Sequence, residues 1–455
     1  MDNHERQVPL PRCSGACLIS PECPTHLYSH HINPLKSNQS DIMKPQSSIS
    51  IQHTSGFNAG ARWFWFTVAA ILSFTSLSHA ELDAKEIDLG IKRTGQRIQR
   101  IYIGTYTGPN SNGIYVCEIN SKTGELTKPR LAAEMESPSW VSIHPNQRFL
   151  YAAGESNTYP NGGSIAAFEI KTDGSLKTIN AVAPNGSGPC HLGIDASGSN
   201  MLVSNYGSGN VASVVIGDEG NVHESNWADQ YPTLDNQQKP HAHHACFTPD
   251  NRFAVVCDAG LDRIYVYKND ASTGALTAND PPYFSTAAET HPRHLTFSND
   301  GKFCYVINEK AMSVTAFSFN QNKGTLQEIQ TISTLPPGYK GEVGSTAELI
   351  LHPSGRFMYG SNRGPDNLVC YKVDEESGTL TLAGHTSTGG KTARSFGIDL
   401  SGRWMLIGNQ NSDTVVQFKI NAKTGKLTPT GTEYPLGSPV CFQFIPSELR
   451  SKNLR

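Results

Sequence analysis

A unit of about fifty residues recurs along the chain beyond Arg97. Each copy reads as an apolar strand, a Pro/Asp-Gly turn, a second strand that ends in Asn or an acidic residue, a third strand and a Gly-x-Leu segment. The glycines of this last segment are spaced by 50, 46, 54, 50, 54 and 47 residues and number seven: Gly124, Gly174, Gly220, Gly274, Gly324, Gly378 and Gly425. A fixed period of this length indicates a fold built from copies of one supersecondary unit.

Each repeat holds about four short strands separated by turn signals. A single sheet of that size cannot bury both of its faces, whereas sheets stacked around a ring cover one another. The WD40 type is disfavoured because no Gly-His and Trp-Asp pair recurs, and the kelch type because paired glycines do not recur at the blade period. We therefore predict an all-β fold over residues 97–447, a seven-bladed β-propeller of four-stranded antiparallel blades.

The two ends of the repeat region complement each other. A strand-like segment at 100–106 precedes the first complete repeat, and the segment 441–444 ends the last one with the pattern of an innermost strand. We predict that these N- and C-terminal strands pair within one blade, which closes the ring and removes free sheet edges.

Composition and charge narrow the range of partners. The chain has 41 Gly, 27 Pro and only 17% charged residues, which favours short strands and tight turns. Its 40 acidic and 37 basic residues give a net charge of -3 with no long block of either sign, so a surface that coats nucleic acid is not expected. We expect a small-molecule partner, no nucleic acid, and a monomer or weak homodimer.

The segment WFWFTVAAILSFTSL at 63–77 is apolar, follows Arg62 and precedes Ser78-His79-Ala80, the outline of a signal peptide. Its length is short for a hydrocarbon core of about 30 Å, which favours a cleaved signal over an anchor. We predict a disordered segment over 1–60, with Met43 as an alternative start, a signal peptide over 61–80, a linker over 81–96 and a tail over 448–455. The mature protein is then periplasmic or secreted and free of the membrane; without use of this segment it is cytoplasmic.

The predicted propeller brings two sets of polar residues to one end of the channel. Strand one of each blade runs down the channel and strand two returns, so residues before the first strand and after the second meet at one mouth. The first set is Trp140, His191, His243, His244, Arg293, His294, Glu348 and Arg394, and the second is Glu155, Asn205, Asp258, Asn308, Glu309, Asn362, Arg363 and Asn409. Turn capping is the alternative role for each of them, above all for the asparagines. Arginines, glutamates and histidines that converge on one concave site are typical of a site for an anionic small molecule.

Five short runs carry a resemblance to a known family. They are Pro240-His241-Ala242-His243, His291-Pro292-Arg293-His294, Tyr305-Val306-Ile307-Asn308-Glu309, Ala347-Glu348-Leu349-Ile350-Leu351-His352-Pro353 and Ser361-Asn362-Arg363-Gly364. Over 98–446 the chain resembles the lactonase propeller family, which includes the non-metal 6-phosphogluconolactonases and the fungal carboxymuconate lactonizing enzymes. The resemblance to the fungal enzymes implies that His243, Arg293, Glu309 and Arg363 are active-site groups. Glu348 and Arg394 lie in segments that resemble the phosphogluconolactonase branch.

Lactone hydrolysis needs an activated water, a stabilised oxyanion and a proton for the leaving alkoxide. We expect Glu309 or Glu348 to be the base, Arg293 and Arg363 to hold the oxyanion or an anionic group, and His243 to supply the proton. The residues expected to bind substrate are Arg394, His241, His191, Asn308, Asn362 and Glu155.

We predict no cofactor and no metal. A strand sends alternate side chains to opposite faces, so only two of His241, His243 and His244 are expected to point together, too few for a metal site. Cys13, Cys17 and Cys23 fit no zinc spacing, and the seven cysteines of the repeat region are expected to be small buried residues. No Gly-x-Ser-x-Gly elbow is present, which disfavours a covalent serine mechanism.

These observations favour a sugar-lactone hydrolase. The resemblance implies 6-phosphoglucono-1,5-lactone as substrate, whereas export favours an unphosphorylated aldonolactone. Two alternatives stay open: lactone formation on a carboxymuconate, and a non-catalytic propeller that binds a ligand or protein.

Overall fold

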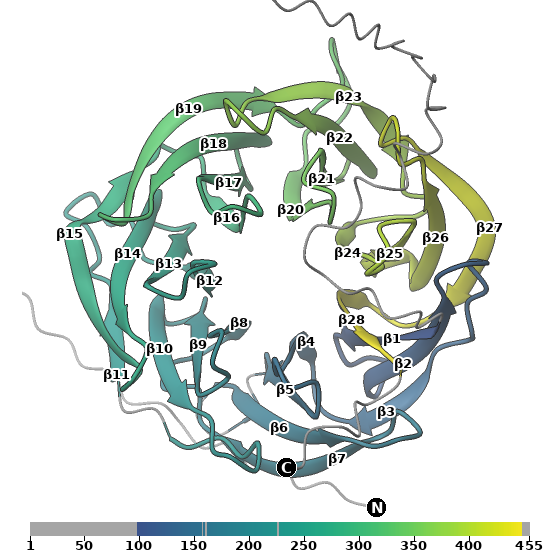
Figure 1. Cartoon of the computed structure of the whole chain (residues 1–455), viewed down its shortest axis with the longest axis horizontal. Coiled ribbons are helices and arrows are strands. Elements are labelled where there is room, and N and C mark those ends of the chain that lie inside the picture. Colours follow the sequence, from purple (N-terminus) through teal and green to yellow (C-terminus); the bar gives the residue numbers. More distant parts are fainter. Residues whose placement is uncertain (1–97, 157, 160–161, 225–226, 448–455) are drawn as a thin grey trace, which may run out of the picture. The chain divides into compact units, whose positions relative to one another are not determined.

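The computed structural model describes residues 98–156, 158–159, 162–224 and 227–447. Over these residues the chain forms seven four-stranded antiparallel sheets around a central channel (Figure 1). The predicted seven-bladed β-propeller is therefore confirmed. The predicted disordered segment, signal peptide, linker and tail lie outside the described residues. Within them, no helix is long and apolar enough to cross a membrane.

Each blade runs from an innermost strand beside the channel to an outermost strand at the rim (Figure 1). In that order the blades are: β28 (Pro439–Pro446), β1 (Ile98–Thr105), β2 (Gly113–Asn120), β3 (Arg130–Glu134); β4 (Pro138–Ile143), β5 (Phe149–Gly154), β6 (Ser164–Ile170), β7 (Leu176–Val182); β8 (Pro189–Ile194), β9 (Asn200–Asn205), β10 (Asn210–Val215), β11 (Trp227–Gln230); β12 (Ala242–Phe247), β13 (Phe253–Asp258), β14 (Arg263–Asp270), β15 (Ala275–Ser285); β16 (Pro292–Phe297), β17 (Phe303–Asn308), β18 (Ser313–Asn320), β19 (Thr325–Ser333); β20 (Ser345–Leu351), β21 (Phe357–Arg363), β22 (Asn367–Val373), β23 (Leu380–Ser387); and β24 (Ala393–Ile398), β25 (Trp404–Asn409), β26 (Thr414–Ile420), β27 (Leu427–Pro435). A short 3-10 helix, η1 (Gln410–Ser412), follows β25.

The ring closes in the blade that holds both ends of the repeat region. Strand β28 is the innermost strand of that blade and pairs antiparallel with β1, with Ile103 opposite Phe442 and Ile101 opposite Phe444. This confirms the predicted pairing of N- and C-terminal strands. The last strand of the chain thus completes the blade that the first strands begin.

The repeated glycines allow neighbouring blades to pack closely. Each lies in the turn between the third and fourth strands of its blade and has a φ between +66° and +85°. A Cβ at Gly378 would lie 2.3 Å from the ring of Phe303, which begins β17 in the preceding blade, and a Cβ at Gly220 would lie 2.4 Å from Phe149. At Gly220 and Gly378, glycine is therefore required both by the left-handed backbone and by the close approach of an aromatic ring.

A β-bulge interrupts every innermost strand near the mouth of the channel. The register with the second strand shifts, for example, between Pro292 and His294 in β16 and between Ala242 and His244 in β12. A bulge places two consecutive residues opposite one, so strict alternation of side chains fails there. The neighbours His243 and His244 both contact the ring of His294, whereas His241 stacks on Tyr206. Two of the three histidines thus point together, as expected, but they are consecutive residues, so the strict alternation assumed for them fails at the bulge.

Candidate active site

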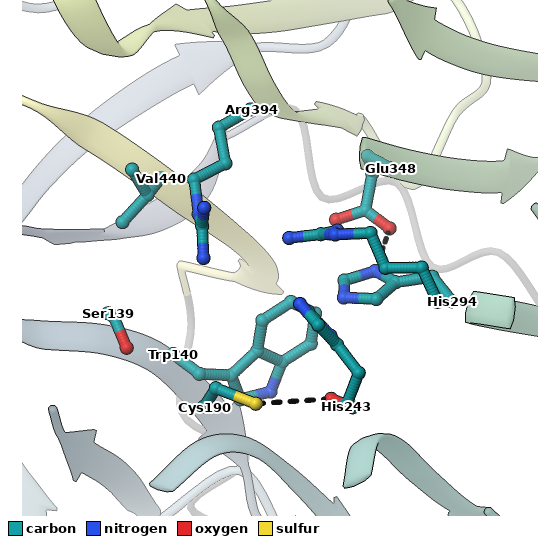
Figure 2. Close-up of a pocket in the computed structure, with 9 residues that line it drawn as sticks. Ser139, Trp140, Cys190, His243, His294, Glu348, Arg394 and Val440 are labelled. Carbon is teal, nitrogen blue, oxygen red and sulfur yellow. Dashed lines mark hydrogen bonds and ion pairs between the residues drawn. The ribbon is translucent and has the colours of Figure 1, made fainter. Parts of the chain in front are cut away.

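The bulges place two side chains from each blade near the mouth of the channel. The residues at the first bulge position form a first ring, namely Ser139, Cys190, His243, Arg293, Ala347, Arg394 and Val440; those at the next position form a second ring, namely Trp140, His191, His244, His294, Glu348, Ser395 and Cys441. Six members of the first ring and three of the second line one pocket: Ser139, Trp140, Cys190, His243, Arg293, His294, Glu348, Arg394 and Val440 (Figure 2).

Glu309 forms ion pairs with two arginines from different strands. It follows β17, and one carboxylate oxygen accepts a hydrogen bond from Arg363 Nη2 at 2.5 Å, while the other lies 3.3 Å from Arg293 Nε. The second contact is an ion pair without a hydrogen bond, because Arg293 Nε has no hydrogen-bond acceptor in the described part of the chain. Burial raises the pKa of Glu309, but Arg293 and Arg363 more than offset this, so the pKa is lowered. Glu309 is therefore a carboxylate at neutral pH and a weak base.

Arg293 is almost completely enclosed, with 2% of its side chain exposed. Burial lowers its pKa to about 10, which still leaves the guanidinium charged at neutral pH. Its Nη1 donates a hydrogen bond to the Ala347 carbonyl oxygen at 2.6 Å, which fixes the side chain between β16 and β20. A buried charge of this kind is held where a ligand can use it as a hydrogen-bond donor.

Arg394 is the pocket arginine without a carboxylate partner. Within the described part of the chain no acidic side chain forms an ion pair with it; its guanidinium lies over the ring of Tyr106, 5.4 Å from the centroid. The Tyr106 hydroxyl donates to Glu155 Oε2 at 2.7 Å. Burial lowers the pKa of Arg394, but the charges of Tyr106 and Glu155 raise it by more than burial lowers it, so the pKa is raised overall. Arg394 is thus a charged group that remains available to an anion.

Glu348 and His294 form a hydrogen-bonded pair at the floor of the pocket. Their side chains are 7% and 4% exposed, and Glu348 Oε1 lies 2.8 Å from His294 Nδ1 (Figure 2). Ser395 Oγ donates to the other carboxylate oxygen at 3.1 Å. Burial raises the pKa of Glu348 and lowers the pKa of His294 well below its usual range. The imidazole is therefore neutral at neutral pH, and its Nδ1–H donates to the carboxyl group.

Three more histidines complete this part of the channel. His191 stacks on His244 with ring centroids 3.9 Å apart, and Trp140 lies 4.2 Å from His191. Burial lowers the pKa of His191, His243 and His244 well below the usual value. These imidazoles are therefore neutral at neutral pH, and the role of His243 as donor of the leaving-group proton stays a prediction.

Comparison with known proteins decides the family. The sequence profile described as Lactonase, 7-bladed beta-propeller matches residues 100–444. The chain belongs to this seven-bladed lactonase family. It is 33% identical over 303 residues to the 6-phosphogluconolactonase of Bacillus subtilis (strain 168), a match that covers 66% of this chain and 84% of the relative. A second 6-phosphogluconolactonase, from Formosa agariphila, is 32% identical over 317 residues, covering 66% and 86% of the two chains.

Among solved structures, the chain is similar to the periplasmic gluconolactonase of Pseudomonas aeruginosa. The TM-score is 0.72 at 28% identity, and the match covers 77% of this chain and all of that one (100%). The proteins to which this chain is similar thus include ones named for a phosphorylated and for an unphosphorylated lactone.

Most residues that the sequence nominated in this lactonase-family chain do lie together. Those that line the pocket or directly contact its lining are His191, His243, Arg293, Glu309, Glu348 and Arg394. Arg363 joins them through Glu309, and Glu155 joins them through Tyr106. His241 lies outside the pocket lining, and its ring stacks on the ring of Tyr206 with centroids 4.5 Å apart. Their roles in catalysis or binding remain predictions.

The two asparagines expected to bind substrate donate hydrogen bonds to neighbouring strand ends and loops. Asn308 Nδ2 donates to Ser313 Oγ at 3.0 Å, and Asn362 Nδ2 donates to the Thr334 carbonyl oxygen at 2.8 Å. These contacts match the turn-capping alternative, because they fix the loops on either side of the pocket.

Sequence reasoning missed two tyrosines and left His294 without a role. Tyr106 and Tyr206 each come one residue after the end of a second strand, as Glu155 and Glu309 do. That shared position was the available signal.

Proposed function

We propose that the chain hydrolyses a sugar lactone in this pocket, with water as the nucleophile. The observation that carries the proposal is a pocket lined by Arg293, Arg394 and the hydrogen-bonded His294–Glu348 pair, with Arg363 joined to Arg293 through Glu309. Attack of water on a lactone carbonyl develops negative charge on the carbonyl oxygen. Fixed guanidinium groups in an enclosed site stabilise that charge more strongly than water does.

The arginines divide into two functions on the basis of their partners. Arg293 and Arg363 share the single charge of Glu309, so together with it they carry one net positive charge for the oxyanion. Among the described residues no such carboxylate pairs with Arg394, which would bind a second anionic or strongly polar group of the substrate, such as a phosphate, or the carboxylate of the product.

The substrate class follows from the relatives and from the predicted export. The named relatives act on 6-phosphogluconolactone or gluconolactone, so an aldono-1,5-lactone is the proposed class. A mature protein outside the cytoplasm would meet mainly unphosphorylated sugars. We therefore favour the unphosphorylated aldonolactone and keep its 6-phosphate as the second candidate.

Proton release separates the candidate functions. The purified full chain is mixed with glucono-1,5-lactone, its 6-phosphate or a carboxymuconate at a pH low enough to suppress spontaneous lactone hydrolysis. We expect a rate above blank with at least one lactone. Turnover of the muconate alone would support the cyclase alternative, and no turnover of any compound would support the non-catalytic propeller.

The variant Arg293→Lys tests the site while keeping its positive charge. The lysine keeps a positive charge near Glu309 but loses the fork that reaches both Glu309 and the Ala347 carbonyl. We expect lactonase activity to fall by at least about tenfold, since one misplaced oxyanion donor typically costs ~10²-fold or more. Full activity in this variant would contradict the proposed site.

A further inference from the structure

We propose that His294, oriented by Glu348, is the base that removes a proton from the attacking water. This assignment rests on the proposed lactonase function and names the group that the sequence left open between two glutamates. It is carried by the geometry of the pocket floor, where His294 and Glu348 both line the cavity and bond to each other.

The two ring nitrogens of His294 differ in their hydrogen bonding within the described part of the chain. Nδ1 is bonded to Glu348 Oε1 at 2.8 Å, and this is the one hydrogen bond that the His294 ring makes within the described part of the chain. Figure 2 shows this second nitrogen on the side of the ring away from Glu348, towards the other lining residues. The bond at Nδ1 keeps the proton there, so Nε2 carries a lone pair that faces the pocket.

The ring cannot easily turn away from this position. It is packed edge-on by Trp140, His243 and His244, with centroid distances of 5.4, 5.1 and 5.0 Å. Four per cent of its side chain is exposed, so the ring is almost completely enclosed by its neighbours. Such packing satisfies the requirement that a catalytic base be held in place before substrate arrives.

Neither glutamate is free to take this role itself. Glu309 is held between Arg293 and Arg363, and those charges keep it ionised. Glu348 has one oxygen bonded to His294 and to the Leu349 amide, and the other to Ser395. The accessible lone pair in the floor therefore belongs to His294.

The reaction then runs in two balanced steps. His294 Nε2 takes a proton from water as the water oxygen bonds to the lactone carbonyl carbon, and the carbonyl π electrons move to oxygen as an oxyanion near Arg293. The oxyanion then re-forms the carbonyl, the bond from carbon to the ring oxygen breaks, and that oxygen takes the proton back from His294. The product is a hydroxy acid, which ionises to the aldonate and releases one proton to solvent.

Glu348 acts in this scheme as a positioning residue. Its carboxylate selects the Nδ1–H form of His294 and stabilises the imidazolium that exists between the two steps. Ser361 Oγ accepts the Glu348 backbone N–H at 2.9 Å, and Ser395 holds the side chain, so the carboxylate itself is fixed.

Two variants test the pair. His294→Asn keeps a side-chain N–H for Glu348 but has no counterpart of Nε2, and we expect kcat for the lactone to fall by at least about 100-fold with KM changed less than about threefold. Glu348→Gln keeps an acceptor for Nδ1–H but removes the charge. We expect kcat to fall at least about tenfold and the acidic limb of the kcat profile to move to lower pH. His385→Gln serves as a control for loss of a histidine that lies outside the pocket and bonds to the Thr334 carbonyl.

Hydroxylamine distinguishes a base from a structural residue. It attacks lactones as a neutral nucleophile and needs less help from a base than water does. In His294→Asn, hydroxamate formation should therefore be retained relative to hydrolysis, and the ratio of the two should rise at least about tenfold over the unsubstituted chain. Near-ultraviolet circular dichroism of each variant reports whether the fold is kept, and Glu348→Gln gives an independent answer if His294→Asn does not fold.

The outcomes separate the base assignment from the function. Hydrolysis that survives His294→Asn with more than about a third of its kcat would overturn the assignment of His294 alone, since a general base contributes ~10²-fold or more. Equal loss of hydroxamate formation and hydrolysis in a folded variant would do the same. Absence of any turnover by the unsubstituted chain would overturn the proposed function, and this assignment with it.

Discussion

The blade-to-blade role of the repeated glycines can be measured by comparing two Gly→Ala variants. Gly378 and Gly431 both have a left-handed backbone, with φ of +72° and +85°. They differ in their surroundings: a Cβ at Gly378 would lie 2.3 Å from the Phe303 ring, whereas a Cβ at Gly431 would have no atom within 4 Å. The first variant therefore carries both a backbone cost and a clash, and the second carries the backbone cost alone.

The magnitudes follow from those two terms. A left-handed conformation costs a residue with a Cβ roughly 1–2 kcal/mol. Forcing an extra methyl group into a packed contact costs about 1–3 kcal/mol more. We expect Gly431→Ala to lower the free energy of unfolding by about 1–2 kcal/mol and Gly378→Ala by about 2–5 kcal/mol.

Equilibrium unfolding in urea, followed by tryptophan fluorescence, measures both changes. A third variant, Gly378→Ala combined with Phe303→Leu, removes ring atoms from the point of contact, so its destabilisation should be smaller than the sum of the two single changes by at least about 0.5 kcal/mol. Equal destabilisation by Gly378→Ala and Gly431→Ala, or strict additivity in the double variant, would refute the packing argument.

Three further predictions concern the pocket and its charges. Glu309→Gln should lower the free energy of unfolding by about 2–3 kcal/mol, which is less than for a fully buried pair because 26% of the Glu309 side chain is exposed. Glu289→Gln is the control, because it removes only an exposed pair with Lys310, and it should change the free energy of unfolding by less than about 1 kcal/mol in the same urea assay. Arg394→Gln should weaken binding of the aldonate product by about tenfold or more in calorimetric titration, since it removes the charge available to an anion; unchanged affinity would place the anion elsewhere. Burial keeps the pKa of His191, His243, His244 and His294 well below the usual value, so the unfolded chain takes up protons near pH 6.5 that the folded chain does not. Stability should therefore be full above that pH and fall by about 1 kcal/mol per histidine from pH 6.5 to 5.5, measured as the shift of the urea transition.

Much of this architecture could be read from local signals. The spacing of Gly124 to Gly425 predicted the number of blades, because each glycine satisfies a turn conformation that depends on its own neighbours in sequence. The apolar segments at 100–106 and 441–444 predicted ring closure, because each has the pattern of a strand and neither has a complete blade of its own. The grouping of His243, Arg293, Glu309 and Arg363 also followed, since antiparallel strands of similar length must return to the same face.

The chemistry within that group depended on the tertiary structure. Bulges in the innermost strands turn neighbouring residues such as Arg293 and His294 towards one pocket, and no sequence period signals a bulge. His294 and Glu348 are 54 positions apart and belong to adjacent blades, so their bond exists only because the ring sets those blades side by side. The sequence by itself determined which side chains are near the mouth; the packing of blade on blade determined which of them share a proton, which share a charge, and which is left free for a ligand.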